Sequence, residues 1–164
     1  MSDFLKKLKA LSKANVVINK IGAEAVNFSK ERFRAQNWVD NNTEQWPKRK
    51  VNKGRETDKR AILTGPGTAR LRRSVRKIRA DADSIVIGTD VPYAQIHNEG
   101  GRFRATQRVK QHKRTSKKGT SYTVNPFTRT ISVNMPRRRF LGNSAILARR
   151  IERVAYVEFN KILK

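Results

Sequence analysis

The stretch VPYAQIHNEGG, residues 91–101, decides how the middle of this chain folds. Pro92 ends any preceding strand, because its ring fixes the backbone and removes an N–H donor. Tyr93 then begins one or two helical turns, which Gly100 or Gly101 would close with a left-handed backbone. The stretch therefore predicts a corner at which a strand turns through a short helix into a new segment.

The histidine of this stretch, His97, raises the question of catalysis. A histidine base needs a substrate or nucleophile within reach and a partner that orients its ring. The chain has no cysteine and no G-x-S-x-G motif, and its 13 acidic residues are scattered. The sharpest enzymatic alternative is a two-metal nuclease, whose candidate carboxylates are Asp81, Asp83, Asp90 and Glu99. We predict no enzyme, metal site or cofactor, and we expect His97 to anchor the corner through a hydrogen bond.

Positive charge dominates the composition. The 164 residues include 38 Lys or Arg and 13 Asp or Glu, which gives a net charge of +25. A chain with so much like charge is expected to lie against a polyanion or within a larger assembly. It has neither the apolar run that a membrane helix needs nor the core of a signal peptide, so we expect a soluble intracellular protein.

Amphipathic segments begin and end the chain. Apolar residues at steps of three and four predict an N-terminal helix over residues 1–36. A second helix is predicted over residues 143–163, with Asn143 or Ser144 as its N-cap. The chain is expected to form a single α+β domain over residues 1–164. In this domain a small antiparallel sheet packs against the long N-terminal helix and the C-terminal helix.

Residues 37–60 are polar and contain Asn-Asn, Trp-Pro and Lys-Gly pairs, so they predict a loop. Trp38 and Trp46 are expected to fasten this loop to the body, because large aromatic rings gain most when they are buried. Stacking of the two rings on nucleic-acid bases is the alternative.

Two alternating runs flank an Asp-Ala-Asp turn over residues 74–89 and predict a hairpin. No Asp or Glu occurs from residue 100 to residue 151, where there are fourteen Lys or Arg. Like charges do not pack on one another, so residues 100–135 are expected to form an extended basic β-arm. This arm is predicted to include a second hairpin centred on Asn125 and Pro126.

Several short motifs occur in a fixed order along the chain. They are Trp46–Pro47, Leu63–Gly65 with Leu71–Ser74, Ile87–Thr89 with Tyr93–His97 and Gly100–Gly101, and Pro136–Gly142. In this order they resemble the phage virion morphogenesis family, also described as tail completion proteins of tailed bacteriophages. The chain departs from the family pattern in a longer segment after Gly65 and in a longer, more basic arm.

The resemblance implies a structural role and no enzymatic activity. Family members are minor virion proteins that complete the tail or join it to the head. For this chain it implies a homo-oligomeric ring, for example a hexamer, around the DNA channel of the neck or connector region. The implied partners are other neck, connector and tail-tube proteins, with non-specific contact to genomic DNA and no membrane. The protein would be assembled in the host bacterial cytoplasm and would remain in the virion.

Charge and resemblance together indicate the candidate site residues. Those for the DNA channel or a subunit interface are Arg102, Arg104, Arg108, Lys110, Lys113, Arg114, Lys117, Lys118, Arg137 and Arg138. Those for the structural corner are Tyr93, His97, Gly100 and Gly101. The motif MPRRRF is expected to place Phe140 and Leu141 in the core and its arginines at a surface. The alternative function is a free basic nucleic-acid-binding protein, which would bind naked DNA or RNA with a steep salt dependence.

Overall fold

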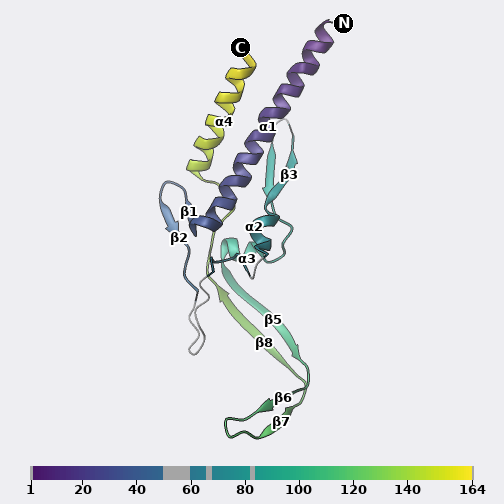
Figure 1. Ribbon diagram of the computed structural model, residues 1–164, viewed down its shortest axis with the longest axis vertical. Helices are drawn as coiled ribbons and strands as arrows, with labels where there is room; N and C mark the ends of the chain where they lie inside the picture. The colour runs from purple at the N-terminus through teal and green to yellow at the C-terminus, as the bar shows by residue number, and fades with distance from the viewer. Residues whose placement is uncertain (1, 50–59, 66–67, 82–83, 164) are drawn as a thin grey trace.

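Two helices and a long β-ribbon point in opposite directions from a small core (Figure 1). The computed structural model describes residues 2–49, 60–65, 68–81 and 84–163. Its elements are α1 (Ser2–Ala35), β1 (Asn37–Val39), β2 (Thr43–Gln45), α2 (Arg70–Ser74), β3 (Arg76–Ala80), β4 (Ile85–Gly88), α3 (Ala94–Glu99), β5 (Gly101–Val109), β6 (His112–Thr115), β7 (Ser121–Val124), β8 (Phe127–Met135) and α4 (Ala145–Leu163). The predicted α+β class is confirmed, although the strands form four separate antiparallel pairs in the described residues and not one sheet.

The core lies where the end of α1 meets α2, α3 and the segment before α4. Phe33 and Phe140 are fully buried, with ring centroids 4.8 Å apart, and the ring of Trp46 meets Phe33 edge-on at 5.5 Å. The remaining buried members are Leu71, Val75, Val91 and Ala94. The core thus joins residues from five parts of the chain, so it can form only when the corner and the end of α1 are both in place.

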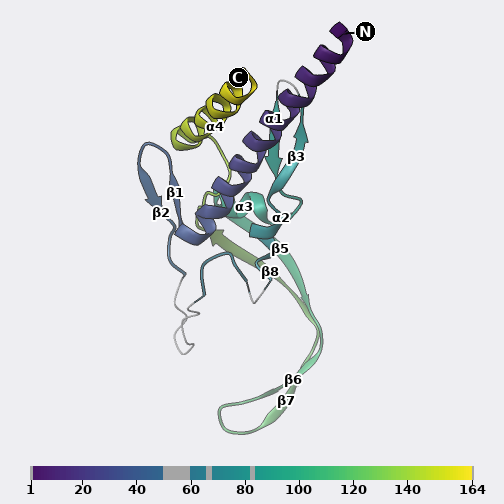
Figure 2. The same ribbon diagram turned by 45° about the horizontal axis from the view of Figure 1, so that its top comes forward.

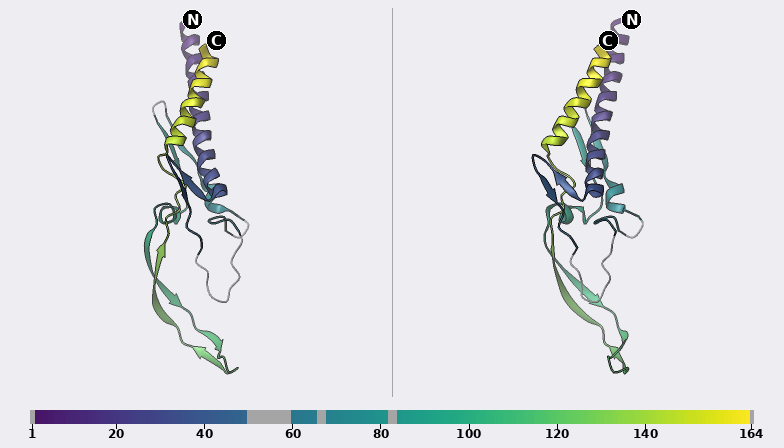
Figure 3. Two further views of the ribbon diagram at one scale, coloured as in Figure 1. Left: turned by 90° about the vertical axis from the view of Figure 1, so that its left-hand side faces the viewer. Right: turned by 60° about the vertical axis from the view of Figure 1, so that its left-hand side comes forward.

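The helices α1 and α4 run side by side away from the core (Figure 3). Ion pairs span them: Arg150 Nη1 lies 2.9 Å from Glu31 and 3.4 Å from Glu24, and Lys20 Nζ lies 2.6 Å from Glu158. The predicted N-cap is confirmed at Ser144, whose Oγ accepts a hydrogen bond from the amide of Leu147 at 3.2 Å. No helix in the described residues is apolar over the length that a bilayer crossing requires.

The predicted loop after α1 is in part a hairpin. Strands β1 and β2 pair antiparallel with Trp38 opposite Glu44, and residues 50–59 of the predicted loop lie outside the described residues. Both tryptophans are buried, at 3% and 5% exposed, and Trp46 Nε1 donates to the carbonyl of Arg139 at 2.9 Å. The prediction that these rings fasten the segment is confirmed, and base stacking is wrong because the rings are covered by the protein itself.

The strands of the hairpin predicted over residues 74–89 are confirmed as β3 and β4, with a bulge between Lys77 and Arg79, while residues 82–83 of its predicted turn lie outside the described residues. The hairpin predicted around Asn125 and Pro126 is wrong. These two residues join β7 to β8 within one strand of a longer hairpin.

The reversal of that long hairpin lies at Ser116–Gly119. The amide of Ser116 donates to the carbonyl of Thr120 at 2.8 Å, and Gly119 supplies a φ of +84°. Proline has no N–H to donate, so Pro126 interrupts the ladder of hydrogen bonds without reversing the chain.

Candidate functional site

The corner predicted from VPYAQIHNEGG is the short helix α3 and the glycines that follow it. Gly100 has a φ of +73° and its amide donates to the carbonyl of Ile96 at 3.0 Å, which closes the helix. A Cβ on Gly100 would lie 2.8 Å from the backbone nitrogen of Arg137. The absence of a side chain therefore allows the outgoing and returning ends of the arm to meet at this point.

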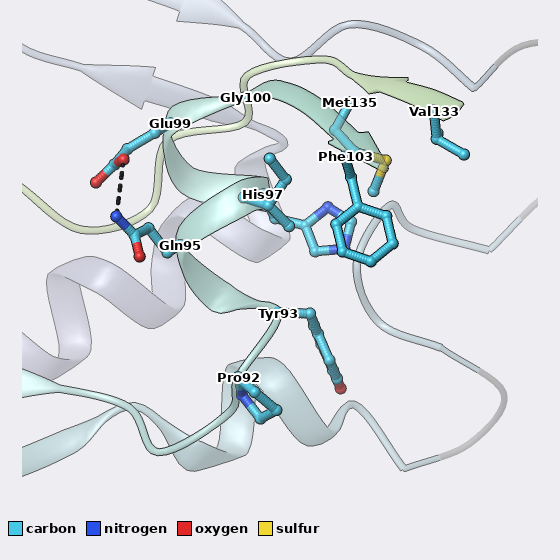
Figure 4. A pocket seen from close by; sticks show the side chains of 10 residues that line it. Pro92, Tyr93, Gln95, His97, Glu99, Gly100, Phe103, Val133 and Met135 are labelled. Atoms are coloured by element: carbon cyan, nitrogen blue, oxygen red, sulfur yellow. Dashed lines mark hydrogen bonds between the residues drawn. The ribbon is translucent and has the colours of Figure 1, made fainter. Parts of the chain in front are cut away.

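His97 does not hold the corner in the expected way. Its imidazole Nδ1 is buried and has no hydrogen-bond partner among the described residues, while its backbone carbonyl accepts from the amide of Arg138 at 2.8 Å. The ring packs edge-on against Tyr93, with centroids 5.8 Å apart (Figure 4). Burial lowers the pKa of His97, and the positive charge of Arg138 lowers it further. The ring therefore packs as a neutral, largely apolar group.

The neighbouring residue, Asn98, provides the hydrogen bonds that we expected from His97. Its Oδ1 accepts from the amides of Phe140 and Leu141, both at 2.9 Å, and its Nδ2 donates to the carbonyl of Leu141 at 3.1 Å. Sequence reasoning missed Asn98, because an Asn before Glu-Gly-Gly reads as an ordinary turn residue.

Of the nuclease candidates, Asp81, Asp90 and Glu99 do not gather as a cluster of metal ligands, and Asp83 lies outside the described residues. Asp90 faces Arg76 at 3.6 Å, and Glu99 accepts a hydrogen bond from Gln95 at 3.3 Å. Figure 4 shows Glu99 and His97 on opposite sides of α3. In the described residues no three His, Asp or Glu side chains gather as metal ligands would. The geometry therefore gives no support to a two-metal mechanism.

An apolar groove of about 670 Å³ lies beside the corner. Its walls come from α3, from the residues before it and from both strands at the base of the arm. They include Tyr93, Phe103, Val133 and Met135 (Figure 4). Ile96 also lines the groove. The groove is mostly hydrocarbon, so it suits packing against an apolar surface better than binding a charged ligand.

The arm consists of the ribbon β5–β8 and a tip formed by β6–β7 (Figure 2). In the ribbon, Gly101 pairs with Met135 and Val109 with Phe127, so every residue has a defined partner. Because successive side chains alternate between faces, the register separates the ribbon into two different surfaces.

One surface, here called the apolar face, carries Phe103, Ala105, Val109, Phe127, Ile131, Val133 and Met135, with Gln107 and Arg129 as its polar pair. The other, here called the arginine face, carries Arg102, Arg104, Thr106, Arg108, Thr128, Thr130, Ser132 and Asn134. Three of the candidate arginines thus form a row beside hydroxyl and amide groups. Neither strand contains an acidic residue.

The remaining candidates are divided between the tip and the segment before α4. Five of them are exposed near or in the tip: Lys110, Lys113, Arg114, Lys117 and Lys118. Arg137 is also exposed, but Arg138 is only 7% exposed and is wrong as a surface candidate.

Arg138 is instead a structural residue. Its Nε and Nη2 donate to the carbonyl of Pro47 at 3.0 and 2.8 Å. Burial lowers its pKa, and the charge of Arg49 adds to this effect. The planar guanidinium therefore ties the segment after β2 to the segment before α4.

A sequence profile of the phage virion morphogenesis family matches residues 1–159. The chain belongs to this family. Searches of curated proteins and of solved structures found no match. Membership in the phage virion morphogenesis family gives the protein a structural role in building the bacteriophage virion. The structure also shows an arm with two different faces and an apolar groove at its base.

Proposed function

We propose that this protein completes the phage tail or joins the tail to the head in the neck region. It would do so without catalysis, as a ring of identical subunits around the DNA channel, in contact with neck, connector and tail-tube proteins. Family membership supports the virion role. The observation that carries the finer proposal is the arm, which projects far from the core and has an arginine row on one face.

The arginine face suits the backbone of DNA. Arg102, Arg104 and Arg108 supply fixed positive charge, and the hydroxyl groups of the opposite strand supply further hydrogen-bond donors to phosphate. Contacts of this kind neutralise phosphates and carry no base information, so the DNA can have any sequence. Such a surface fits a channel through which the whole genome must pass.

The charge balance supports assembly as well. A net charge of +25 on one chain opposes its own close association. DNA inside a ring would neutralise part of that charge, and this would favour a closed assembly. The elongated shape, with helices at one end and the arm at the other, leaves large surfaces that neighbouring subunits would cover.

Imaging of particles tests the proposal. Cryo-electron microscopy of particles made with and without this protein should show a ring of density at the head-proximal end of the tail only when it is present. Complementation with Arg102→Gln/Arg104→Gln should lower the yield of infectious particles, while the charge-matched variant Arg149→Gln/Arg153→Gln, on the exposed side of α4, should not. Absence of the protein from purified virions would contradict the proposal.

A free nucleic-acid-binding protein is the second candidate, favoured by the same arginine row. In that case the isolated chain would bind naked duplex DNA tightly. The salt slope of binding would fall by about 2 in the Arg102→Gln/Arg104→Gln variant, because each lost phosphate contact removes about one unit. Tight binding by the isolated chain, together with its absence from virions, would favour this candidate.

A further inference from the structure

The apolar face of the ribbon has no cover within its own chain. Phe103 is 51% exposed, Phe127 44% and Val133 39%. Beyond the groove at its base, neither β5 nor β8 packs closely on another element of the described residues. Several exposed large apolar side chains on one face of the ribbon mark a contact surface.

Helix α4 carries a second uncovered surface on the side away from α1. Ala148, Glu152, Tyr156 and Phe159 repeat at steps of four, four and three and therefore lie on one stripe, here called the outer stripe of α4. Tyr156 is 71% exposed and Phe159 52%. Glu152 has no ion-pair partner among the described residues, in contrast to Glu158 on the inner side.

These two surfaces cannot meet within one chain. The arm and α4 extend from the core in opposite directions, as Figure 1 and Figure 3 both show. Only two copies of the chain can bring them together. Because the surfaces differ, the contact is head-to-tail, which is the kind of contact that closes into a ring when the rotation between subunits permits.

The charges on the two surfaces are complementary. The apolar face contains a single charged residue, Arg129, and the outer stripe of α4 contains a single charged residue, Glu152, of opposite sign. Arg129 is exposed and held by a hydrogen bond from its Nε to Gln107 at 2.9 Å. Pairing of Arg129 with Glu152 would place one salt bridge inside an otherwise apolar contact and would fix its register.

The spacings match within about 1 Å on one side of that pair and within about 4 Å on the other. Phe127 lies two strand residues from Arg129, about 7 Å, and the small Ala148 lies four helical residues from Glu152, about 6 Å. In the other direction Val133 lies about 14 Å from Arg129, and Phe159 about 10 Å from Glu152. The large Phe127 thus faces a small residue, while Phe159 reaches Val133 and the groove beside it.

We infer that the outer stripe of α4 of one copy docks on the apolar face of the arm of the next copy, with Arg129 opposite Glu152. This inference rests on the proposed function, because it names the contact that builds the ring. It also explains the two faces of the arm: the apolar face is covered by a neighbouring subunit, and the arginine face remains free.

Disulfide trapping tests the docking in the full-length chain, which has no cysteine of its own. The variant Val133→Cys/Phe159→Cys should form a ladder of cross-linked oligomers on a non-reducing gel. The control Ser132→Cys/Phe159→Cys moves one cysteine to the arginine face and should not. Equal ladders from both variants, or none from either, would overturn the inference.

Charge reversal provides an independent readout by sedimentation. Arg129→Glu and Glu152→Arg should each weaken self-association about tenfold, and the double variant should restore it. Arg108→Glu, on the arginine face of the same ribbon, should leave self-association unchanged. Failure of the double variant to restore association would overturn the pairing. Negative-stain images of the same samples separate the two proposals: rings with no 133–159 cross-link would refute the docking alone, and monomers throughout would refute both.

Discussion

Asn98 and Leu141 exchange hydrogen bonds across 43 residues of chain. The amide of Leu141 donates to Asn98 Oδ1 at 2.9 Å, and Asn98 Nδ2 donates to the carbonyl of Leu141 at 3.1 Å. The arm leaves the body after Asn98 and returns before Leu141, so this exchange closes the base of the arm. The side chain of Asn98 thereby acts as one more rung of the ladder, at the point where the backbone strands separate.

Replacing Asn98 should therefore loosen the base of the arm. Asn98→Ala leaves the amides of Phe140 and Leu141 without their acceptor in a partly buried position. We expect a loss of about 2–4 kcal/mol in the free energy of unfolding, measured by urea denaturation. Gln95→Ala, on the exposed side of the same helix, should change it by less than about 0.5 kcal/mol. Similar values for the two variants would contradict the role given to Asn98.

Gly100 should not tolerate a side chain, because its φ is positive and because a Cβ would clash with the backbone of Arg137. Gly119 has a positive φ like Gly100, but a Cβ there would meet no atom within 4 Å. Gly119→Ala should therefore report backbone strain alone, about 1–2 kcal/mol. Gly100→Ala adds the clash with the backbone of Arg137, and the φ of +73° and ψ of −170° at Gly100 are open almost only to glycine, so it should cost at least about 1 kcal/mol more. Thermal unfolding of both variants gives the comparison, and equal losses would rule out close approach as the reason for Gly100.

Replacement of the adjacent residues Arg137 and Arg138 by alanine should have very different effects on the free energy of unfolding. Arg138→Ala removes both donors from the carbonyl of Pro47 and leaves a cavity, so we expect a loss of about 2–4 kcal/mol. Arg137→Ala removes an exposed side chain and should change the free energy of unfolding by less than about 0.5 kcal/mol. Chemical denaturation distinguishes them. An unchanged free energy of unfolding in Arg138→Ala would contradict this structural role.

Acid should destabilise the protein in part through His97. Burial lowers the pKa of His97 in the folded chain, so near pH 6 the unfolded chain binds the proton more tightly. Protonation then favours unfolding, and stability falls as the pH drops below the ordinary histidine value of 6.5. His97→Phe keeps an aromatic ring against Tyr93 without a titrating group. Its free energy of unfolding should fall less between pH 7 and pH 5 than that of the wild type, and parallel curves would contradict this assignment.

The features that sequence alone predicts here are those with short-range causes. Apolar steps of three and four indicated both long helices, and Ser144 could be recognised as a cap because capping involves only the next few residues. The closure of α3 by Gly100 belongs to the same class. Interactions between residues that are close in sequence are sufficient to predict each of these features.

The features that sequence reasoning missed depend on distant partners. The burial of Arg138 depends on a carbonyl that comes 91 residues earlier, whereas charge alone suggests exposure. The role of Asn98 depends on a segment beyond the whole arm. The two faces of the arm are visible as alternation in residues 101–109, but their extent follows only once the register with residues 127–135 is known. The misplaced hairpin shows that a proline in a strand pattern can mark an interruption as well as a reversal.

The interruption at Pro126 has a mechanical consequence. Pairing stops at Val109 opposite Phe127 and resumes at His112 opposite Val124, so no ladder hydrogen bonds stiffen the four residues between the ribbon and the tip. Figure 2 shows the tip turned sharply at this point. The arm therefore consists of two paired segments joined by an unpaired junction, and the angle between ribbon and tip can change there without breaking a ladder hydrogen bond.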